Sequence, residues 1–223
     1  MKRIGMVGGL GVGAAVFYYE KLAQALVERG LEPGLVISHA DIGRAYTHVQ
    51  KGEMDALAAY LNQHLTMLAS AGCEIGVIAA VTPLICWPQL APVAGLPLVD
   101  VFEAVNGELA RRKAKRVGVL GTQFVMQSDM FGRLQDVDIV RLSEEALDLV
   151  QRNYLIIART GRVDFADIEG IRAVAKRLAD DGADAVILAG TELSLAFDET
   201  NAGFPVLDAG RVHINAILRD ALA

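Results

Sequence analysis

The sequence of 223 residues contains only two cysteines, no long apolar run and no excess of basic charge. Cys73 and Cys86 are too few to support a disulfide framework or a cysteine metal site, so both thiols are expected to be reduced. No apolar run approaches the roughly 18 residues of a membrane span. The N-terminus leads directly into strand-like sequence without the cleavage region of a signal peptide. We therefore expect a soluble cytoplasmic protein with no metal and no membrane partner.

The net charge of −6 at pH 7 gives no reason to expect a nucleic-acid partner. Basic residues gather only at positions 111–116, and a solvated helix end explains that cluster better than a nucleic-acid patch does. Hydrophobic residues make up 53% of the chain and fall in many short runs separated by glycine, proline or charge. This pattern is typical of buried parallel strands and indicates an ordered α/β protein.

Three segments recur in the second half of the chain, in the same order and at nearly the same spacing. Residues 2–9 resemble residues 115–122, residues 72–80 resemble residues 182–190, and residues 96–100 resemble residues 204–208. Chance does not readily produce three matches in register, so the pattern indicates an internal duplication. We predict two pseudo-symmetric parallel-sheet α/β lobes with helices on both faces. The first lobe would contain residues 1–99 and 209–223, and the second residues 100–208.

Each recurring segment is a short β-branched run that closes on small residues and precedes a helical pattern, as a strand before a crossover helix does. Strands are predicted at residues 3–7, 34–38, 75–79, 96–99, 116–120, 137–141, 184–188 and 204–207. Helices are predicted at residues 14–29, 54–71 and 166–181, each of which a glycine follows. Ser143 is predicted to be the N-cap of a further helix.

Open parallel sheets bind ligands outside the carboxyl ends of their strands, where helix N-termini direct N–H groups outward. The loops at these ends are Gly8-Gly9, Gly121-Thr122, residues 80–82 and residues 190–192. If the halves pack about a pseudo-twofold axis, the four loops surround one cleft and Ala80 lies opposite Gly190. Such a cleft suits chemistry that needs one group on each face of a small substrate.

At these loops the chain resembles the aspartate/glutamate racemase superfamily, especially its aspartate racemase branch, over nearly its whole length. The resemblance rests on residues 4–11, 117–122, 186–193 and 204–208, with Met126, Phe131 and His213. It implies an isomerase-type amino-acid racemase that needs no cofactor and acts on a small amino acid or dicarboxylate. A thiol from each half would remove and return a proton on opposite faces of the substrate. We also expect a homodimer.

The chain departs from the family pattern at both thiol positions. The first falls on Ala80, where the family has Cys-Asn-Thr, and the second on Gly190, where it has Cys-Thr-Glu. The internal repeat pairs the same two positions, and neither residue can exchange a proton. Cys73 and Cys86 are interpreted as packing residues. Two-thiol racemisation is therefore not expected of this sequence as it stands.

Carboxylate recognition by hydroxyls and backbone N–H groups does not depend on the missing thiols. The predicted substrate-binding residues are Gly8, Gly9, Gln50, Val81, Thr82, Gly121, Thr122, Arg159 and Thr191. Gln50 and Arg159 are included because they fall near family positions that contact the distal carboxylate. Each threonine has an alternative role as a helix N-cap, and Gln50 and Arg159 have one as solvated surface residues.

Glu192 is the best candidate for an acid or base, because a small apolar cleft raises the pKa of a carboxyl group toward neutrality. Its alternative role is that of a first-turn acid that stabilises the following helix. Thr82 and Thr191 are further catalytic candidates. Lesser candidates are Asp41, His39 and His48, which could line the mouth of the cleft, whereas Asp100 and Asp208 are explained as helix caps and His213 as a packing residue.

Three other functions remain compatible with the sequence. One is a ligand-binding relative without catalysis, and another is a decarboxylase, lyase or isomerase that uses Glu192 or a threonine. The third follows from Gly9, Gly11 and Ala14, which satisfy the G-x-G-x-x-A pattern of dinucleotide-binding proteins. That pattern is weak here, because residues 36–39 lack the acidic residue expected at the end of the second strand.

Overall fold

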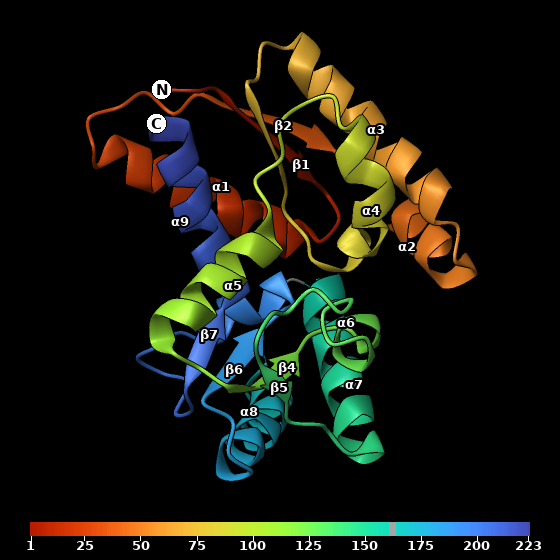
Figure 1. Cartoon of the computed structure of the whole chain (residues 1–223), viewed down its shortest axis with the longest axis vertical. Helices are drawn as coiled ribbons and strands as arrows, with labels where there is room; N and C mark the ends of the chain where they lie inside the picture. The colour runs from red at the N-terminus through yellow and green to blue at the C-terminus, as the bar shows by residue number, and fades with distance from the viewer. Residues whose placement is uncertain (161–163) are drawn as a thin grey trace. The chain divides into compact units, whose positions relative to one another are not determined.

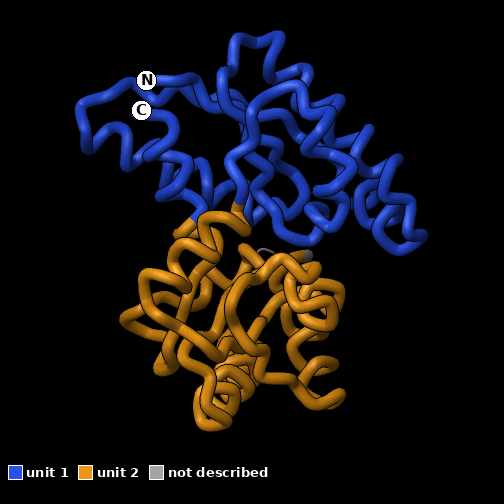
Figure 2. Tube along the Cα trace, viewed as in Figure 1, with its two compact units in different colours: residues 1–100, 213–223 blue, residues 101–212 orange. Residues whose placement is uncertain are grey.

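The computed structural model describes residues 1–160 and 164–223, with only the backbone described for residues 159 and 160. The chain folds into two compact units, one of residues 1–100 with 213–223 and one of residues 101–212 (Figure 2). The sequence had placed the boundaries after residues 99 and 208. None of the helices in the described ranges is both long and apolar enough to cross a membrane.

The first unit contains a three-stranded parallel sheet in the order β2-β1-β3 (Figure 1). Its strands are β1 (Ile4–Gly8), β2 (Leu35–His39) and β3 (Ile75–Ile78). Its helices are α1 (Val12–Val27), α2 (Ile42–Lys51), α3 (Met54–Ser70) and α4 (Trp87–Leu90), with short 3-10 turns η1 (Thr82–Cys86) and η2 (Ala91–Val93) and most of α9 (Ala209–Leu222). All five residues of β1 and all four of β3 are buried, as parallel strands covered on both faces require.

The strand predicted at residues 96–99 is wrong, because only a single parallel bridge forms there, between Gly76 and Leu98. The backbone N–H of Gly76 donates to the carbonyl of Pro97 at 2.8 Å, and that of Val99 donates to the carbonyl of Gly76 at 3.0 Å. These two bonds form the single bridge, and the segment 96–99 is otherwise irregular. The segment nevertheless lies beside β3, where the internal repeat places it.

The second unit contains a four-stranded parallel sheet in the order β5-β4-β6-β7 (Figure 1). Its strands are β4 (Arg116–Leu120), β5 (Asp138–Ile139), β6 (Ala185–Leu188) and β7 (Val206–Asp208). Its helices are α5 (Val101–Arg112), α6 (Gln123–Gln127), α7 (Glu144–Thr160) and α8 (Phe165–Asp180), with the 3-10 turn η3 (Thr191–Leu195). Strand β5 is shorter than predicted, and β7 begins after Pro205, whose carbonyl accepts a 2.7 Å bond from the N–H of Val186.

Two equivalent glycines show how closely the halves repeat each other in packing. A Cβ on Gly5 of β1 would lie 2.9 Å from Cβ of Leu68 in α3, and one on Gly118 of β4 would lie 2.6 Å from Cδ1 of Leu178 in α8. Each helix therefore packs directly on the bare backbone of the equivalent strand. The duplication seen in the sequence is thus repeated in strand order and in helix–sheet contacts.

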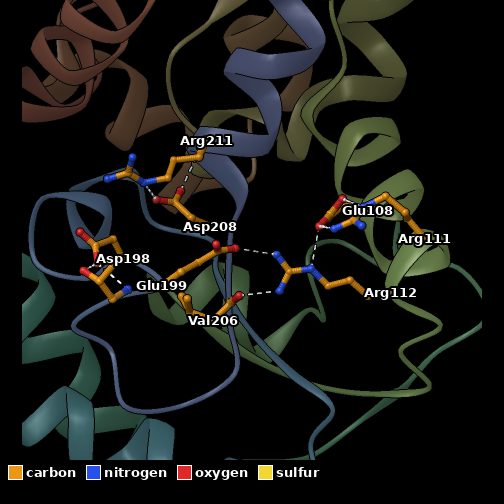
Figure 3. Close-up of polar contacts among 9 residues, drawn as sticks. Glu108, Arg111, Arg112, Asp198, Glu199, Val206, Asp208 and Arg211 are labelled. Atoms are coloured by element: carbon orange, nitrogen blue, oxygen red, sulfur yellow. Dashed lines mark hydrogen bonds and ion pairs between the residues drawn. The ribbon is translucent and has the colours of Figure 1, made fainter.

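A polar network fixes the loop before β7 and the start of α9 (Figure 3). Arg112, at the end of α5, donates to a carboxylate oxygen of Glu108 at 2.6 Å, to the carbonyl of Val206 at 2.7 Å and to Glu199 at 3.1 Å. The bonds from Arg111 and Arg112 lower the pKa of Glu108 to about 2. Helix α5 is thereby joined to strand β7.

Candidate functional site

In the first unit, the Gly8-Gly9 loop lies directly against the end of β2. The N–H of Ala40 donates to the carbonyl of Gly8 at 2.8 Å. Gly9 has a φ of +81°, and a Cβ there would lie 2.3 Å from the carbonyl oxygen of Ala40 and 2.8 Å from the ring of His39. Only glycine fits this turn without moving its neighbours.

The predicted first thiol position lies just beyond β3. Ala80 and Val81 are buried, and the half-buried Thr82 begins the turn η1. The methyl group of Ala80 has no proton that it can exchange at neutral pH. Because Thr82 is the first residue of η1 rather than its N-cap, a capping role does not explain it.

In the second unit, the structure brings Gly121 and Gly190 together. A Cβ on Gly121 would lie 3.2 Å from the carbonyl of Ala189 and 3.3 Å from the backbone nitrogen of Gly190. Thr122 and Thr191, which follow these glycines, are both buried. Thr122 occupies the N-cap position of α6 without a side-chain capping bond. The two loops predicted to bind substrate in this half are therefore neighbours at one end of the sheet.

Glu192 is buried, with 3% of its surface exposed, in the turn that follows β6. Its carboxylate accepts a short hydrogen bond from the hydroxyl of Tyr154 in α7. Burial raises the pKa of Glu192, and the bond from Tyr154 opposes that rise. The pKa of Tyr154 is itself raised, first by burial and then by the negative charge of Glu192. Glu192 is thus a carboxyl group kept from water that accepts bonds from the Tyr154 hydroxyl and from a backbone N–H.

Sequence reasoning missed Tyr154. A tyrosine in the middle of an amphipathic helix carries no signal beyond that of a core residue. The glycine at residue 190 is the only sequence feature connected with Tyr154. Gly190 adopts an ordinary extended conformation with φ −119° and ψ 115°, so the backbone does not require glycine there, but this is known only from the structure.

Asp208 ties the turn η3 to the start of α9. Its buried carboxylate accepts bonds from Oγ of Ser194 at 2.8 Å, from the N–H of Arg211 at 3.0 Å and from Nε of Arg211 at 3.1 Å. Burial raises the pKa of Asp208, and these bonds oppose the rise. The predicted capping role of Asp208 is confirmed, and the contact with Ser194 holds the turn that carries Thr191 and Glu192.

The remaining candidates have local structural roles, are exposed on a helix, or lie outside the described residues. Asp41 caps α2 by accepting a 2.6 Å bond from the N–H of Arg44, and His48 pairs with Glu53 at 2.8 Å. Gln50 is exposed on α2. The side chain of Arg159 lies outside the described residues.

Neither cysteine is a reactive thiol. Burial raises the pKa of Cys86 to about 12, and its Sγ donates to the carbonyl of Pro83 at 3.2 Å. Burial also raises the pKa of Cys73, whose side chain packs beside Gly5. Across residues 1–160 and 164–223, no group of three or more His, Cys, Asp or Glu side chains is arranged to hold a metal ion.

Comparisons with known proteins identify one family. The family model described as Asp/Glu/Hydantoin racemase matches residues 7–217. Among solved structures, a candidate Asp/Glu racemase from Yersinia pestis shares 23% identity over the whole of both chains, with a TM-score of 0.87. An aspartate racemase homologue from Pyrococcus horikoshii OT3 shares 24% identity over the whole of both chains, with a TM-score of 0.82. A liganded double mutant of arylmalonate decarboxylase, 14% identical over 99% of this chain and 93% of its own, has the same fold with a TM-score of 0.62.

Proposed function

Because the chain belongs to the Asp/Glu/hydantoin racemase family, we propose that it binds a small amino acid or dicarboxylate at the carboxyl ends of its parallel strands. On this proposal, a single carboxyl group, Glu192, moves the proton, and no metal or organic cofactor takes part. Two-thiol racemisation is not its reaction, because Ala80 and Gly190 have no ionisable side chain. On this proposal the protein uses one proton-transfer group where a racemase of the family uses two.

The binding part of the proposal is supported by the loops at the strand ends. Gly8-Gly9 and Gly121-Thr122 each follow a buried parallel strand, and backbone N–H groups in such loops suit a carboxylate. The hydroxyls of Thr82, Thr122 and Thr191 add donors at the equivalent loops of each half. A dicarboxylate would use both kinds of donor.

The observation that carries the catalytic part is the environment of Glu192. Burial raises its pKa, which brings the carboxyl group closer to the range in which it both accepts and returns a proton. As a base, Glu192 would take the hydrogen from the carbon next to the substrate carboxylate. The C–H bond breaks, an O–H bond forms on Glu192, and the electron pair stays on the substrate as an enolate. Return of the proton to the same face gives exchange without inversion.

The same group also suits decarboxylation, which is the second candidate. When a malonate-type acid loses carbon dioxide, the carbanion left behind needs one proton, and protonated Glu192 would supply it. This reaction requires a single acid, which matches the one proton-transfer group proposed here, Glu192. The shared fold of arylmalonate decarboxylase is compatible with it.

The test is incubation in deuterated water with L- and D-aspartate, L- and D-glutamate and a disubstituted malonate, followed by NMR. We expect deuterium at the α-carbon, or loss of carbon dioxide, and a fall of about 100-fold or more in Glu192→Gln. Glu145→Gln, which changes an exposed first-turn acid of α7, is the matched control and should retain the activity. Saturable binding without exchange or decarboxylation would instead identify a binding protein, and the catalytic proposal would then be wrong.

A further inference from the structure

The space beside Gly190 is filled by an aromatic ring from another helix. A Cβ on Gly190 would lie 2.3 Å from Cε2 of Tyr154 and 2.9 Å from its Cζ. Cβ atoms in proteins essentially never approach another heavy atom more closely than 3.0 Å. The end of a flexible side chain could move away, but a buried aromatic ring could not. The backbone of Gly190 is ordinary, so the ring of Tyr154, and not the turn, requires glycine at this position.

Separate contacts fix the ring and the hydroxyl of Tyr154. Its ring belongs to the core cluster of the second unit, which also contains Ile157 of α7 and Leu193 of η3. Its hydroxyl donates to Glu192, two residues beyond Gly190. Only 7% of Tyr154 and 3% of Glu192 are exposed, so water does not compete for this bond.

We propose that Tyr154 is the positioning residue for Glu192: its ring takes the side-chain position of residue 190, and its hydroxyl holds the Glu192 carboxyl at the end of β6. This inference rests on the proposed role of Glu192 as the proton-transfer group. The phenol and the carboxyl then form one unit, in which the hydroxyl fixes the orientation of the carboxylate and stabilises its charged form. The bond from Tyr154 partly offsets the effect of burial on the pKa of Glu192.

The positioning role is tested by titration of Glu192 in the whole protein, which needs no substrate. The carboxyl ¹³C resonance of Glu192 is assigned by its loss in Glu192→Gln and followed against pH. Tyr154→Phe keeps the ring and removes only the donor, so the titration midpoint of Glu192 should move upward. A midpoint unchanged in Tyr154→Phe would overturn the proposal, because a ring that only packs leaves this value where it was.

The steric part is tested by a double-mutant cycle on thermal unfolding. Gly190→Ala should lower the unfolding midpoint by about 5 °C or more in the wild-type background, because the new Cβ collides with the ring. In the Tyr154→Ala background, Gly190→Ala should leave the unfolding midpoint nearly unchanged or raise it. Gly107→Ala in α5, where no atom lies within 4 Å of the added Cβ, is the matched control. Equal losses in both backgrounds would show that the ring does not occupy the position of a side chain at residue 190.

The two proposals can fail separately. Deuterium exchange that depends on Glu192, together with an unchanged titration in Tyr154→Phe, would keep the proposed function and overturn the role of Tyr154. A shifted titration in Tyr154→Phe, with neither exchange nor decarboxylation of any acid tested, would keep the contact between Tyr154 and Glu192 and overturn the proposed function. If Tyr154→Ala does not fold, Tyr154→Leu replaces it in the cycle, and the titration of Tyr154→Phe remains decisive.

Discussion

The hydroxyl of Tyr18 donates a 2.9 Å hydrogen bond to Nδ1 of His213, although the two residues lie 195 positions apart in the chain. The other ring nitrogen, Nε2, donates to the carbonyl of Val99 at 2.9 Å. Both bonds are buried, and together they assign the proton of the neutral ring to Nε2. The C-terminal helix α9 is thereby attached to α1 and to the segment that ends the first unit.

We predict that His213 makes the stability of the protein depend on pH. Burial lowers the pKa of His213 to about 4, below its ordinary value of 6.5. The unfolded chain therefore binds this proton first as the pH falls. The stability that the neutral ring contributes is complete above about pH 6.5 and is lost toward pH 4. A difference of this size corresponds to about 3 kcal/mol.

The measurement is urea unfolding at a series of pH values between 7 and 4. His213→Gln should be less stable at pH 7 and should lose less further stability as the pH falls. His39→Gln, which replaces an exposed histidine, serves as the control. Parallel curves for His213→Gln and the wild type would show that another group causes the acid sensitivity.

We predict that Gly9 tolerates a side chain far less well than Gly30 does. Both have positive φ values, +81° and +70°, so alanine costs about 1 kcal/mol at either position from backbone strain alone. At Gly9 the added Cβ would also strike the carbonyl of Ala40, whereas nothing lies within 4 Å at Gly30. Gly9→Ala should therefore be destabilising by about 2 kcal/mol more than Gly30→Ala in denaturant unfolding. Equal losses would mean that the loop at the end of β1 adjusts freely.

We predict that Arg112 stabilises the second unit more than Arg111 does, although both bind Glu108. Arg112 also donates to the carbonyl of Val206, and its side chain is 27% exposed against 71% for Arg111 (Figure 3). Arg112→Ala should lower the free energy of unfolding by about 1–2 kcal/mol, because it leaves a strand carbonyl without this donor. Arg111→Ala should change it by about 0.5 kcal/mol or less. Similar effects of the two variants would show that the bond to Val206 contributes nothing.

Much of the fold could be predicted from the sequence because it depends on local patterns. Buried parallel strands require continuous apolar runs, and the recurrence of three such runs indicated two pseudo-symmetric parallel-sheet lobes. The segment at 96–99 has the same pattern but forms only one bridge, whereas the equivalent segment forms β7 after Pro205. A pattern of apolar residues indicates burial, but it does not fix how many ladder bonds form.

Some features of the candidate site could likewise be read from the sequence, and others could not. Residue identity and order along one chain are enough to show that Ala80 and Gly190 carry no ionisable group and that Glu192 follows a strand end. The place of Tyr154, whose ring fills the side-chain position of residue 190 and whose hydroxyl bonds to Glu192, is seen only in the folded chain. Tyr154 and Glu192 come from different elements, 38 positions apart, and their contact depends on how α7 packs against the turn after β6. That packing is set by the volumes of many core side chains together, which no local pattern in the sequence records.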